Sequence, residues 1–268
     1  MKVIDAATAA ESPEDVLWVG TSWKMNKGLA DARAYIRGLT DYLSRTRLPG
    51  VQPFVIPSFT ALTTARDELG SEATILLGVQ NAHWDDAGAW TGEVSVAQAK
   101  DAGARIVEIG HSERREHFGE TVETTRLKVS AALDHGLIPL LCIGESAEVK
   151  SAGKTSEFIL EQAAGALSGL TAEQLGRVLI AYEPIWAIGE HGRPATVEEM
   201  RPPFADLGRQ YGGSTRGLLY GGSVNVDNAR DMLSIDHVTG LFVGRTAWQL
   251  RGYQQILEIA AAHPKANR

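Results

Sequence analysis

The chain has 268 residues, of which 44% are hydrophobic and 22% charged, and its formal net charge is -7. This length and composition allow one large core, and a single α/β barrel often has this length. The negative charge disfavours nucleic acid and anionic membranes as partners, and no apolar run reaches the ~18 residues of a membrane-spanning helix. Because Cys142 is the only cysteine, no internal disulfide can form, which is typical of a protein of the reducing cytoplasm.

Residues 1–16 are predicted to form a flexible tail. Their apolar runs are too short for a secretory signal, and they carry too many acids for a transit peptide. Residues 17–268 are predicted to form a single catalytic domain.

Short β-rich runs alternate with longer helical stretches along this domain. A helix is predicted over about 31–43, where Ile36 and Leu39 share one face. Another is predicted over 121–135, with Gly136 placed to cap it. Thr171 and Gln174 form a capping-box pattern that marks a helix start before the sixth strand.

Eight segments are predicted to be strands, and helical stretches separate them. Each is an unbroken apolar run rather than an alternating one, which is typical of a parallel sheet whose outer face is covered by helices. The count favours a closed (β/α)₈ barrel over an open, doubly wound sheet. The predicted strands are residues 17–20, 51–56, 74–80, 104–109, 137–143, 178–182, 217–220 and 241–243.

Polar groups follow the C-terminal ends of five of these strands, the end at which such barrels build their active sites. Alone, each has an ordinary interpretation: a surface lysine, a buried structural histidine, a solvent-facing strand-end glutamate or a glycine turn. Together, at corresponding strand ends, they indicate one site. The groups are Ser22 to Lys24, His111 to Glu113, Glu183, Gly221 to Ser223, and Gly244 with Arg245.

The sixth strand leads directly into the most informative stretch. Glu183 ends its apolar run, Pro184 cannot continue a sheet ladder, and Gly189 offers a hinge a few residues later. A carboxylate at the end of a buried strand loses hydration and destabilises the fold, so its presence there suggests a functional role. This order predicts a strand, then a catalytic base, then a mobile lid over residues 184–196.

Four sequence blocks resemble the signature blocks of the triosephosphate isomerase family. They are Trp23-Lys-Met-Asn, Gly110-His-Ser-Glu-Arg-Arg, Ala181-Tyr-Glu-Pro-Ile-Trp-Ala-Ile-Gly and Tyr220-Gly-Gly-Ser-Val-Asn, and the resemblance extends from Leu17 to the C-terminal helix. It implies a TIM barrel that forms a homodimer and interconverts a phosphorylated ketose and aldose, without cofactor or metal. Residues 88–93, with Trp90 as an apolar anchor, resemble the family segment that inserts into the partner subunit.

The resemblance also implies roles for individual residues. Glu183 matches the family's catalytic base, and His111 matches the neutral histidine that polarises the carbonyl, in a setting where Ser112 could open a helix. Lys24 matches the lysine that stabilises negative charge on the substrate, with Glu113 as a plausible partner. The N–H groups expected to bind the phosphate are those of Gly189, Gly222, Ser223 and Gly244.

Three departures from the family pattern stand near this site. Ser22 replaces the usual asparagine, the lid is one residue longer and carries Pro194, and Gly244 is followed by Arg245 and then by Trp248. They resemble the branch that isomerises erythrulose phosphates in erythritol breakdown. We take as the leading hypothesis an isomerase that converts an erythrulose phosphate into an erythrose-phosphate-type product. The alternatives are glycolytic triosephosphate isomerase and, in a different class, a non-catalytic sugar-phosphate sensor.

Overall fold

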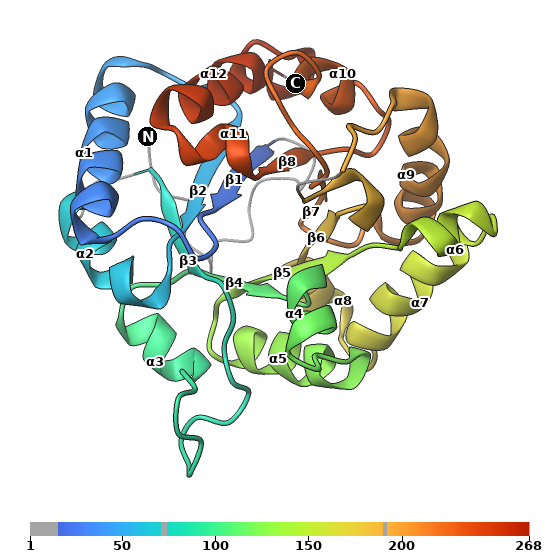
Figure 1. The fold of residues 1–268 in the computed structure, drawn as a ribbon, viewed down its shortest axis with the longest axis horizontal. Coiled ribbons are helices and arrows are strands. Elements are labelled where there is room, and N and C mark those ends of the chain that lie inside the picture. Colours follow the sequence, from blue (N-terminus) through green and yellow to red (C-terminus); the bar gives the residue numbers. More distant parts are fainter. Residues whose placement is uncertain (1–15, 71–73, 190–191, 268) are drawn as a thin grey trace.

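The computed structural model describes residues 16–70, 74–189 and 192–267. Its centre is a closed barrel of parallel strands that pair in sequence order, with β1 joined to β8 (Figure 1). The (β/α)₈ barrel predicted from the sequence is therefore confirmed. The strands are β1 (Leu17–Ser22), β2 (Val51–Ile56), β3 (Leu76–Val79), β4 (Ile106–Ile109), β5 (Ile138–Ile143), β6 (Leu179–Tyr182), β7 (Gly217–Tyr220) and β8 (Gly240–Val243).

Helices form a ring around the barrel, and the segment between β3 and α3 projects outward from that ring (Figure 1). The larger helices are α1 (Leu29–Arg45), α2 (Phe59–Leu69), α5 (Val122–Asp134), α7 (Thr155–Ala166), α9 (Val197–Tyr211) and α12 (Leu250–Ala261). The shorter ones are α3 (Val96–Asp101), α4 (Ser112–His117), α6 (Ala147–Ser151), α8 (Ala172–Leu175), α10 (Ala229–Leu233), α11 (Arg245–Trp248), and the 3₁₀ turns η2 (Ile185–Ala187) and η3 (Pro264–Asn267).

Both faces of the barrel strands are buried, which explains their unbroken apolar runs. Outward side chains pack under the helices, whereas inward ones form a separate interior cluster. Within that cluster the ring of Phe54 lies 6.4 Å from Trp18 and 5.9 Å from Phe242, measured between ring centroids. Gly20 makes room for this ring, because a Cβ there would lie 2.0 Å from it.

The observed element ends differ from the predicted ones by a few residues. The first helix is longer than predicted, and the third strand is two residues shorter at its N-terminal end and one at its C-terminal end. The capping predictions are confirmed: Thr171 forms a capping box with Gln174, and Gly136 follows α5 with a φ of 77°. Thr121, before α5, forms a capping box as well. The predicted tail falls almost entirely on residues 1–15, outside the described residues.

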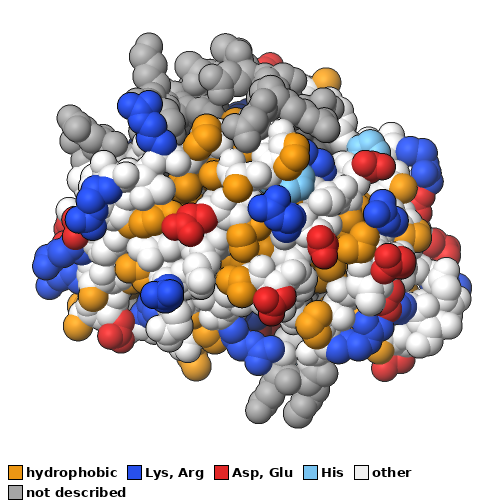
Figure 2. Space-filling model, turned by 90° about the horizontal axis from the view of Figure 1, so that it is seen from above, with side chains coloured by type: hydrophobic (Ala, Val, Ile, Leu, Met, Phe, Trp, Pro, Cys, Tyr) orange, Lys and Arg blue, Asp and Glu red, His pale blue; other side chains and the backbone are white. Residues whose placement is uncertain are grey.

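Acidic and basic side chains are interspersed on the face of the molecule in Figure 2, without one extended patch of a single sign. That face therefore lacks the basic stripe typical of nucleic-acid-binding surfaces. Within the described part of the chain, no helix is both long enough and apolar enough to cross a membrane.

Candidate active site

One cavity of about 590 Å³ opens at the C-terminal ends of the strands. The closed barrel brings the ends of β1, β4, β6, β7 and β8 around it, although these segments are far apart in sequence. Every site residue predicted from the sequence lies on its wall: Ser22, Lys24, His111, Glu113, Glu183, Gly189, Gly222, Ser223, Gly244 and Arg245.

Glu183 follows β6 and is 4% exposed. Its N–H donates to the carbonyl oxygen of Ile143 at 2.8 Å, which holds the strand end in register with β5. Two glycines make room for it: a Cβ on Gly144 would lie 2.0 Å from its carbonyl oxygen, and one on Gly221 would lie 2.7 Å from its Cγ. Burial, together with the nearby charge of Glu108, raises the pKa of the Glu183 carboxyl to about 8.

His111 is the N-cap of α4, and its Nδ1 accepts a hydrogen bond from the Glu113 N–H at 3.2 Å. Burial and the neighbouring charge of Lys24 lower the pKa of His111 to about 4. The imidazole is therefore neutral near pH 7, and with Nδ1 accepting, the proton lies on Nε2. Nε2 faces Glu183, 3.7 Å from its Oε2.

Lys24 and Glu113 form an ion pair at the mouth of the cavity, with Nζ 2.5 Å from Oε1. Lys24 has a φ of 51°, uncommon for a residue with a side chain, and Gln80 holds its carbonyl oxygen with a 2.9 Å hydrogen bond. Partial burial raises the pKa of Glu113, but the hydrogen bond from Lys24 and the positive charge of its ammonium outweigh it, so the pKa of Glu113 lies below the ordinary value. The pairing predicted from the sequence is confirmed.

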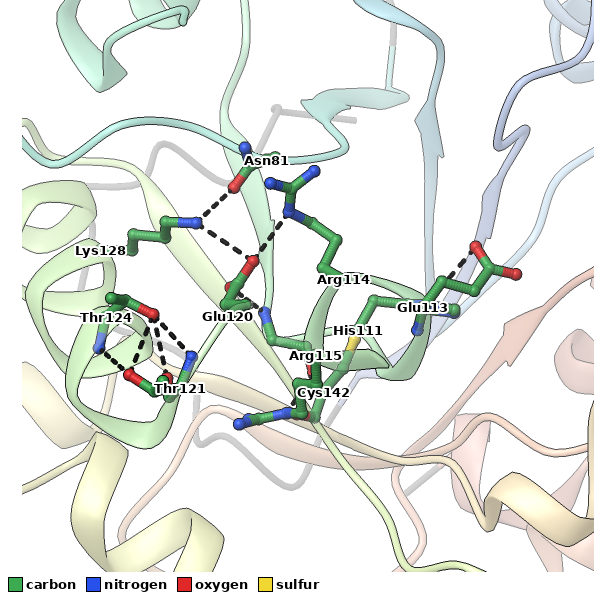
Figure 3. A network of polar contacts seen from close by, with 11 residues as sticks. Asn81, His111, Glu113, Arg114, Arg115, Glu120, Thr121, Thr124, Lys128 and Cys142 are labelled. Atoms are coloured by element: carbon green, nitrogen blue, oxygen red, sulfur yellow. Dashed lines mark hydrogen bonds and ion pairs between the residues drawn. The ribbon is translucent and has the colours of Figure 1, made fainter. Parts of the chain in front are cut away.

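A buried polar network behind His111 fixes the turn that follows β4 (Figure 3). Glu120 accepts a hydrogen bond from the Gly110 N–H at 2.8 Å, and it pairs with Arg114 at 2.7 Å and with Lys128 at 3.1 Å. Arg115 in turn donates to the Gly110 carbonyl oxygen at 2.7 Å. These contacts hold both the N–H and the carbonyl group of Gly110, the residue before His111, and so they help to set the position of the His111 ring.

The opposite side of the cavity is lined by backbone of the loops after β6, β7 and β8. Gly189 has a φ of 79°, a conformation that favours glycine. The Ser223 hydroxyl donates to the Ala187 carbonyl oxygen at 2.6 Å, and Arg245 donates to that of Gly189 at 2.8 Å. The side chains of Ser223 and Arg245 thus hold the start of the predicted lid, while Gly222 and Gly244 leave their backbone open to a ligand.

The far end of the predicted lid is anchored by a charged cluster. Glu199 pairs with both Lys150 and Arg193 at 2.5 Å, and both cations lie over the ring of Trp186. The hydrogen bond from Arg193 is the main reason that the pKa of Glu199 is held well below its ordinary value. Glu190 and His191, in the predicted lid, lie outside the described residues.

One cavity residue, Glu108, was missed by the sequence-based prediction. It lies on β4, 3% exposed, and burial raises the pKa of its carboxyl to about 7. The available signal was a lone charge inside the apolar run of that strand. Within residues 16–70, 74–189 and 192–267, no three His, Cys, Asp or Glu side chains are grouped to hold a metal ion.

Comparisons with known proteins agree with this geometry. The family model described as Triosephosphate isomerase matches residues 17–260. The chain is 77% identical over 250 residues to the L-erythrulose-1-phosphate isomerase of Mycolicibacterium smegmatis, covering 93% of this chain and 95% of that protein. It is 48% identical over 254 residues to the protein of that name from Rhizobium rhizogenes, covering 91% and 95%.

Among solved structures, the crystal structure of triosephosphate isomerase from Bartonella henselae superimposes with a TM-score of 0.80 at 34% identity, covering 91% of this chain and 98% of that one. Sequence and structure therefore agree over nearly the whole barrel, including the strand ends that line the cavity. The chain belongs to the triosephosphate isomerase family.

Proposed function

We propose that this protein is a cofactor-independent isomerase that moves the carbonyl group of a tetrulose phosphate through an enediolate, with L-erythrulose 1-phosphate as substrate. The observation that carries the proposal is the juxtaposition of His111 Nε2 and Glu183 Oε2, 3.7 Å apart in a cavity that also holds Lys24. A base and a neutral hydrogen-bond donor at this spacing suit proton transfer next to a carbonyl. The substrate follows from the name of relatives that are 46–77% identical.

In the first step, the ionised carboxylate of Glu183 takes a proton from the carbon beside the carbonyl. The C–H electron pair becomes the new carbon–carbon double bond, and the carbonyl oxygen becomes an oxyanion. The Nε2–H of His111 donates a hydrogen bond to this oxygen, and the Lys24 ammonium stabilises its charge. In the second step, the protonated Glu183 carboxyl returns its proton to the former carbonyl carbon. The hydroxyl on the neighbouring carbon gives its proton, by way of His111, to the former carbonyl oxygen, and its own oxygen becomes the new carbonyl oxygen.

The phosphorylated end of the substrate decides which product forms. With the phosphate on carbon 1 and the carbonyl on carbon 2, as in dihydroxyacetone phosphate, the proton leaves carbon 3 and returns to carbon 2. The carbonyl then stands on carbon 3, and the product is a second tetrulose phosphate. An erythrose phosphate, the product type expected from the sequence, forms from an erythrulose phosphorylated on carbon 4, whose carbonyl moves to carbon 1.

The phosphate is assigned to the backbone N–H groups of Gly189, Gly222, Ser223 and Gly244, with the Arg245 guanidinium beside them. This side of the cavity is formed by the loops after strands six to eight, where barrels of this class often bind phosphate. A closed lid over it excludes water and suppresses loss of phosphate from the enediolate.

We also propose a homodimer. Met25 is 98% exposed and Phe59 38%, and both line a groove next to Lys24. Trp90, 49% exposed, lies on the projecting segment between β3 and α3. Two copies related by a two-fold axis can insert this segment into that groove and bury all three side chains. The contact adjoins Lys24 and would hold its unusual backbone conformation in place.

The proposed function is tested by kcat/KM for L-erythrulose 1-phosphate and dihydroxyacetone phosphate, measured with one preparation. We expect kcat/KM to be ~10- to 200-fold higher for the tetrulose phosphate, the discrimination that one additional carbon in a fitted pocket provides. An equal or higher kcat/KM for dihydroxyacetone phosphate would instead indicate a glycolytic triosephosphate isomerase. Solvent deuterium incorporation into the tetrulose phosphate tests the sensor alternative, because a binding protein would incorporate none.

A further inference from the structure

Glu108 is a buried acid for which the reaction described above has no task. It occupies an inward position on β4, between Val107 and Ile109, which pack outward under the helices. Ile106, two residues earlier, packs in the barrel interior. Glu108 thus stands at the top of the interior, directly on the wall of the cavity that holds Glu183.

This carboxyl group is only partly satisfied within the protein. Its Oε2 is buried without a hydrogen-bond partner among the described residues. The side chain of Ser22 and the charge of Lys24 lower its pKa, yet burial outweighs both. A buried polar atom left without a partner destabilises a fold, so an apolar side chain here would serve the barrel better. Its presence on a ligand cavity indicates a group that is completed by the ligand.

The barrel order shows which part of a ligand Glu108 meets. Strand β4 lies opposite β8 in the closed ring. Gly244 and Arg245, on the phosphate side, follow β8, so Glu108 faces the cavity from the other side. It also lies within β4, three residues before His111, which follows the strand end, and therefore lies deeper in the barrel. A sugar phosphate held by the β8 loop turns its far end toward Glu108.

We propose that Glu108, together with Ser22, forms the subsite for the terminal hydroxymethyl group of the four-carbon substrate, the group that a triose phosphate lacks. The proposal rests on the tetrulose phosphate as substrate. The hydroxyl on carbon 4 bonds to the free Oε2 of Glu108, while the short side chain of Ser22 leaves room for the added carbon. A triose leaves Oε2 buried and unpartnered, as it is in the free protein, so Glu108 favours the longer sugar over the triose.

The test compares two variants on two substrates. Glu108→Gln keeps the shape and can still bond to a hydroxyl, whereas Glu108→Leu keeps a similar volume and cannot. We expect Glu108→Leu to lower kcat/KM for L-erythrulose 1-phosphate by ~10- to 100-fold, the loss that follows from stranding a buried hydroxyl. Measured above the acid limb of the pH profile, where Glu183 is ionised in both proteins, its kcat/KM for dihydroxyacetone phosphate should change by less than ~3-fold, because that substrate never reaches the subsite. Glu108→Gln should retain most of the tetrulose preference.

A binding measurement keeps the test independent of turnover. Calorimetry with two unreactive ligands, a tetritol phosphate and glycerol phosphate, should show that the wild-type protein prefers the tetritol and that Glu108→Leu loses this preference. Equal losses for both sugars in Glu108→Leu would overturn the proposal, since Glu108 would then act through Glu183 rather than on the fourth carbon. Unchanged ratios would overturn it too.

Failure of the substrate assignment gives a different result. If the wild-type protein itself prefers the triose in turnover, the proposed function has failed, whatever the variants do. If the wild-type protein prefers the tetrulose and Glu108→Leu keeps that preference, only the subsite has failed. Thermal unfolding of both variants confirms folding, and removal of a buried acid from an apolar strand favours it.

Discussion

The side chains of His111 and Glu183 face one another across the cavity, with Nε2 of the histidine 3.7 Å from Oε2 of the glutamate. Burial lowers the pKa of the imidazole and raises that of the carboxyl, so both shifts remove charge from the pair. A positively charged imidazolium would stabilise the carboxylate and so make Glu183 a weaker base. A neutral imidazole can instead donate from Nε2 while the carboxylate takes the proton.

Glu183→Gln is expected to lower kcat by at least ~10²–10⁴-fold, the usual contribution of a positioned base. The amide fills the same space beside Gly221, so phosphate-ligand binding should stay within a few-fold of the wild-type value. Steady-state kinetics and calorimetry with glycerol phosphate check both parts. Near-normal turnover would remove Glu183 from the role of base.

The pH dependence of kcat/KM should report the interaction between Glu108 and Glu183. The charge of Glu108 helps to raise the pKa of Glu183. Glu108→Gln removes that charge, so the acid limb of kcat/KM should move to lower pH. The substrate phosphate also titrates near pH 6, but it is common to both proteins and cancels in the comparison. Superimposable profiles would show that the two carboxyls do not interact.

Stability should depend on pH through the same acid. The pKa of Glu108 is raised from 4.5 to about 7 in the folded protein, so the folded state binds more protons than the unfolded state between these values. Its contribution to the free energy of unfolding is therefore favourable at low pH and is lost as pH rises toward 7. The free energy of unfolding of Glu108→Leu, relative to that of wild type, should therefore be about 1–3 kcal/mol higher at pH 8.5 than at pH 5, since one pKa unit is ~1.4 kcal/mol.

Glu120 offers the matched control for that measurement. It is also buried, but pairing with Lys128 and Arg114 outweighs burial and lowers its pKa. Its contribution has the opposite sign: it is present above the ordinary pKa and lost as pH falls. Glu120→Gln should therefore lower stability near neutral pH. Urea unfolding at pH 5 and 8.5 measures the free energy of unfolding of both variants and of wild type. If the difference between Glu108→Leu and wild type does not change with pH, the raised pKa of Glu108 is contradicted.

Ser22→Asn should reduce the preference for the four-carbon substrate. Ser22 is 5% exposed on the cavity wall, and Trp248 fixes its carbonyl oxygen with a 2.9 Å hydrogen bond. The larger amide therefore has to extend into the cavity and occupy the space of the fourth carbon. We expect kcat/KM for the tetrulose phosphate to fall ~10-fold or more relative to that for the triose. Parallel assays decide this, and equal changes for both substrates would exclude Ser22 from selectivity.

Met25→Glu should dissociate the proposed dimer. A carboxylate in an apolar contact loses its hydration without gaining a partner, so association should weaken by at least ~10-fold. Light scattering over a concentration series measures this. Lys154→Glu, an exposed change on the N-cap of α7, should leave association unchanged. A wild-type protein that stays monomeric and fully active at all concentrations would contradict the dimer.

Much of the fold follows from local sequence. Unbroken apolar runs identified the strands, and the capping pattern of Thr171 with Gln174 identified a helix start, because these signals depend on neighbours in the chain. The predicted site residues could likewise be located at strand ends, since parallel strands bring those ends to one edge. Strand lengths were less well predicted, because apolar residues beyond a strand's hydrogen bonds, such as Ile75, are buried as well.

Other features depended on the tertiary structure. The distance between His111 and Glu183 could not be predicted from the sequence. Only closure of the barrel places Nε2 of the histidine 3.7 Å from Oε2 of the glutamate. A lone charge inside an apolar run was the only sequence signal for Glu108, and it did not place the residue on the cavity wall. The direction of a strand side chain is set by register, and its pKa by the groups that surround it. Residue types and their order are local properties of the chain, whereas burial, charge and distance arise only when strands far apart in sequence meet.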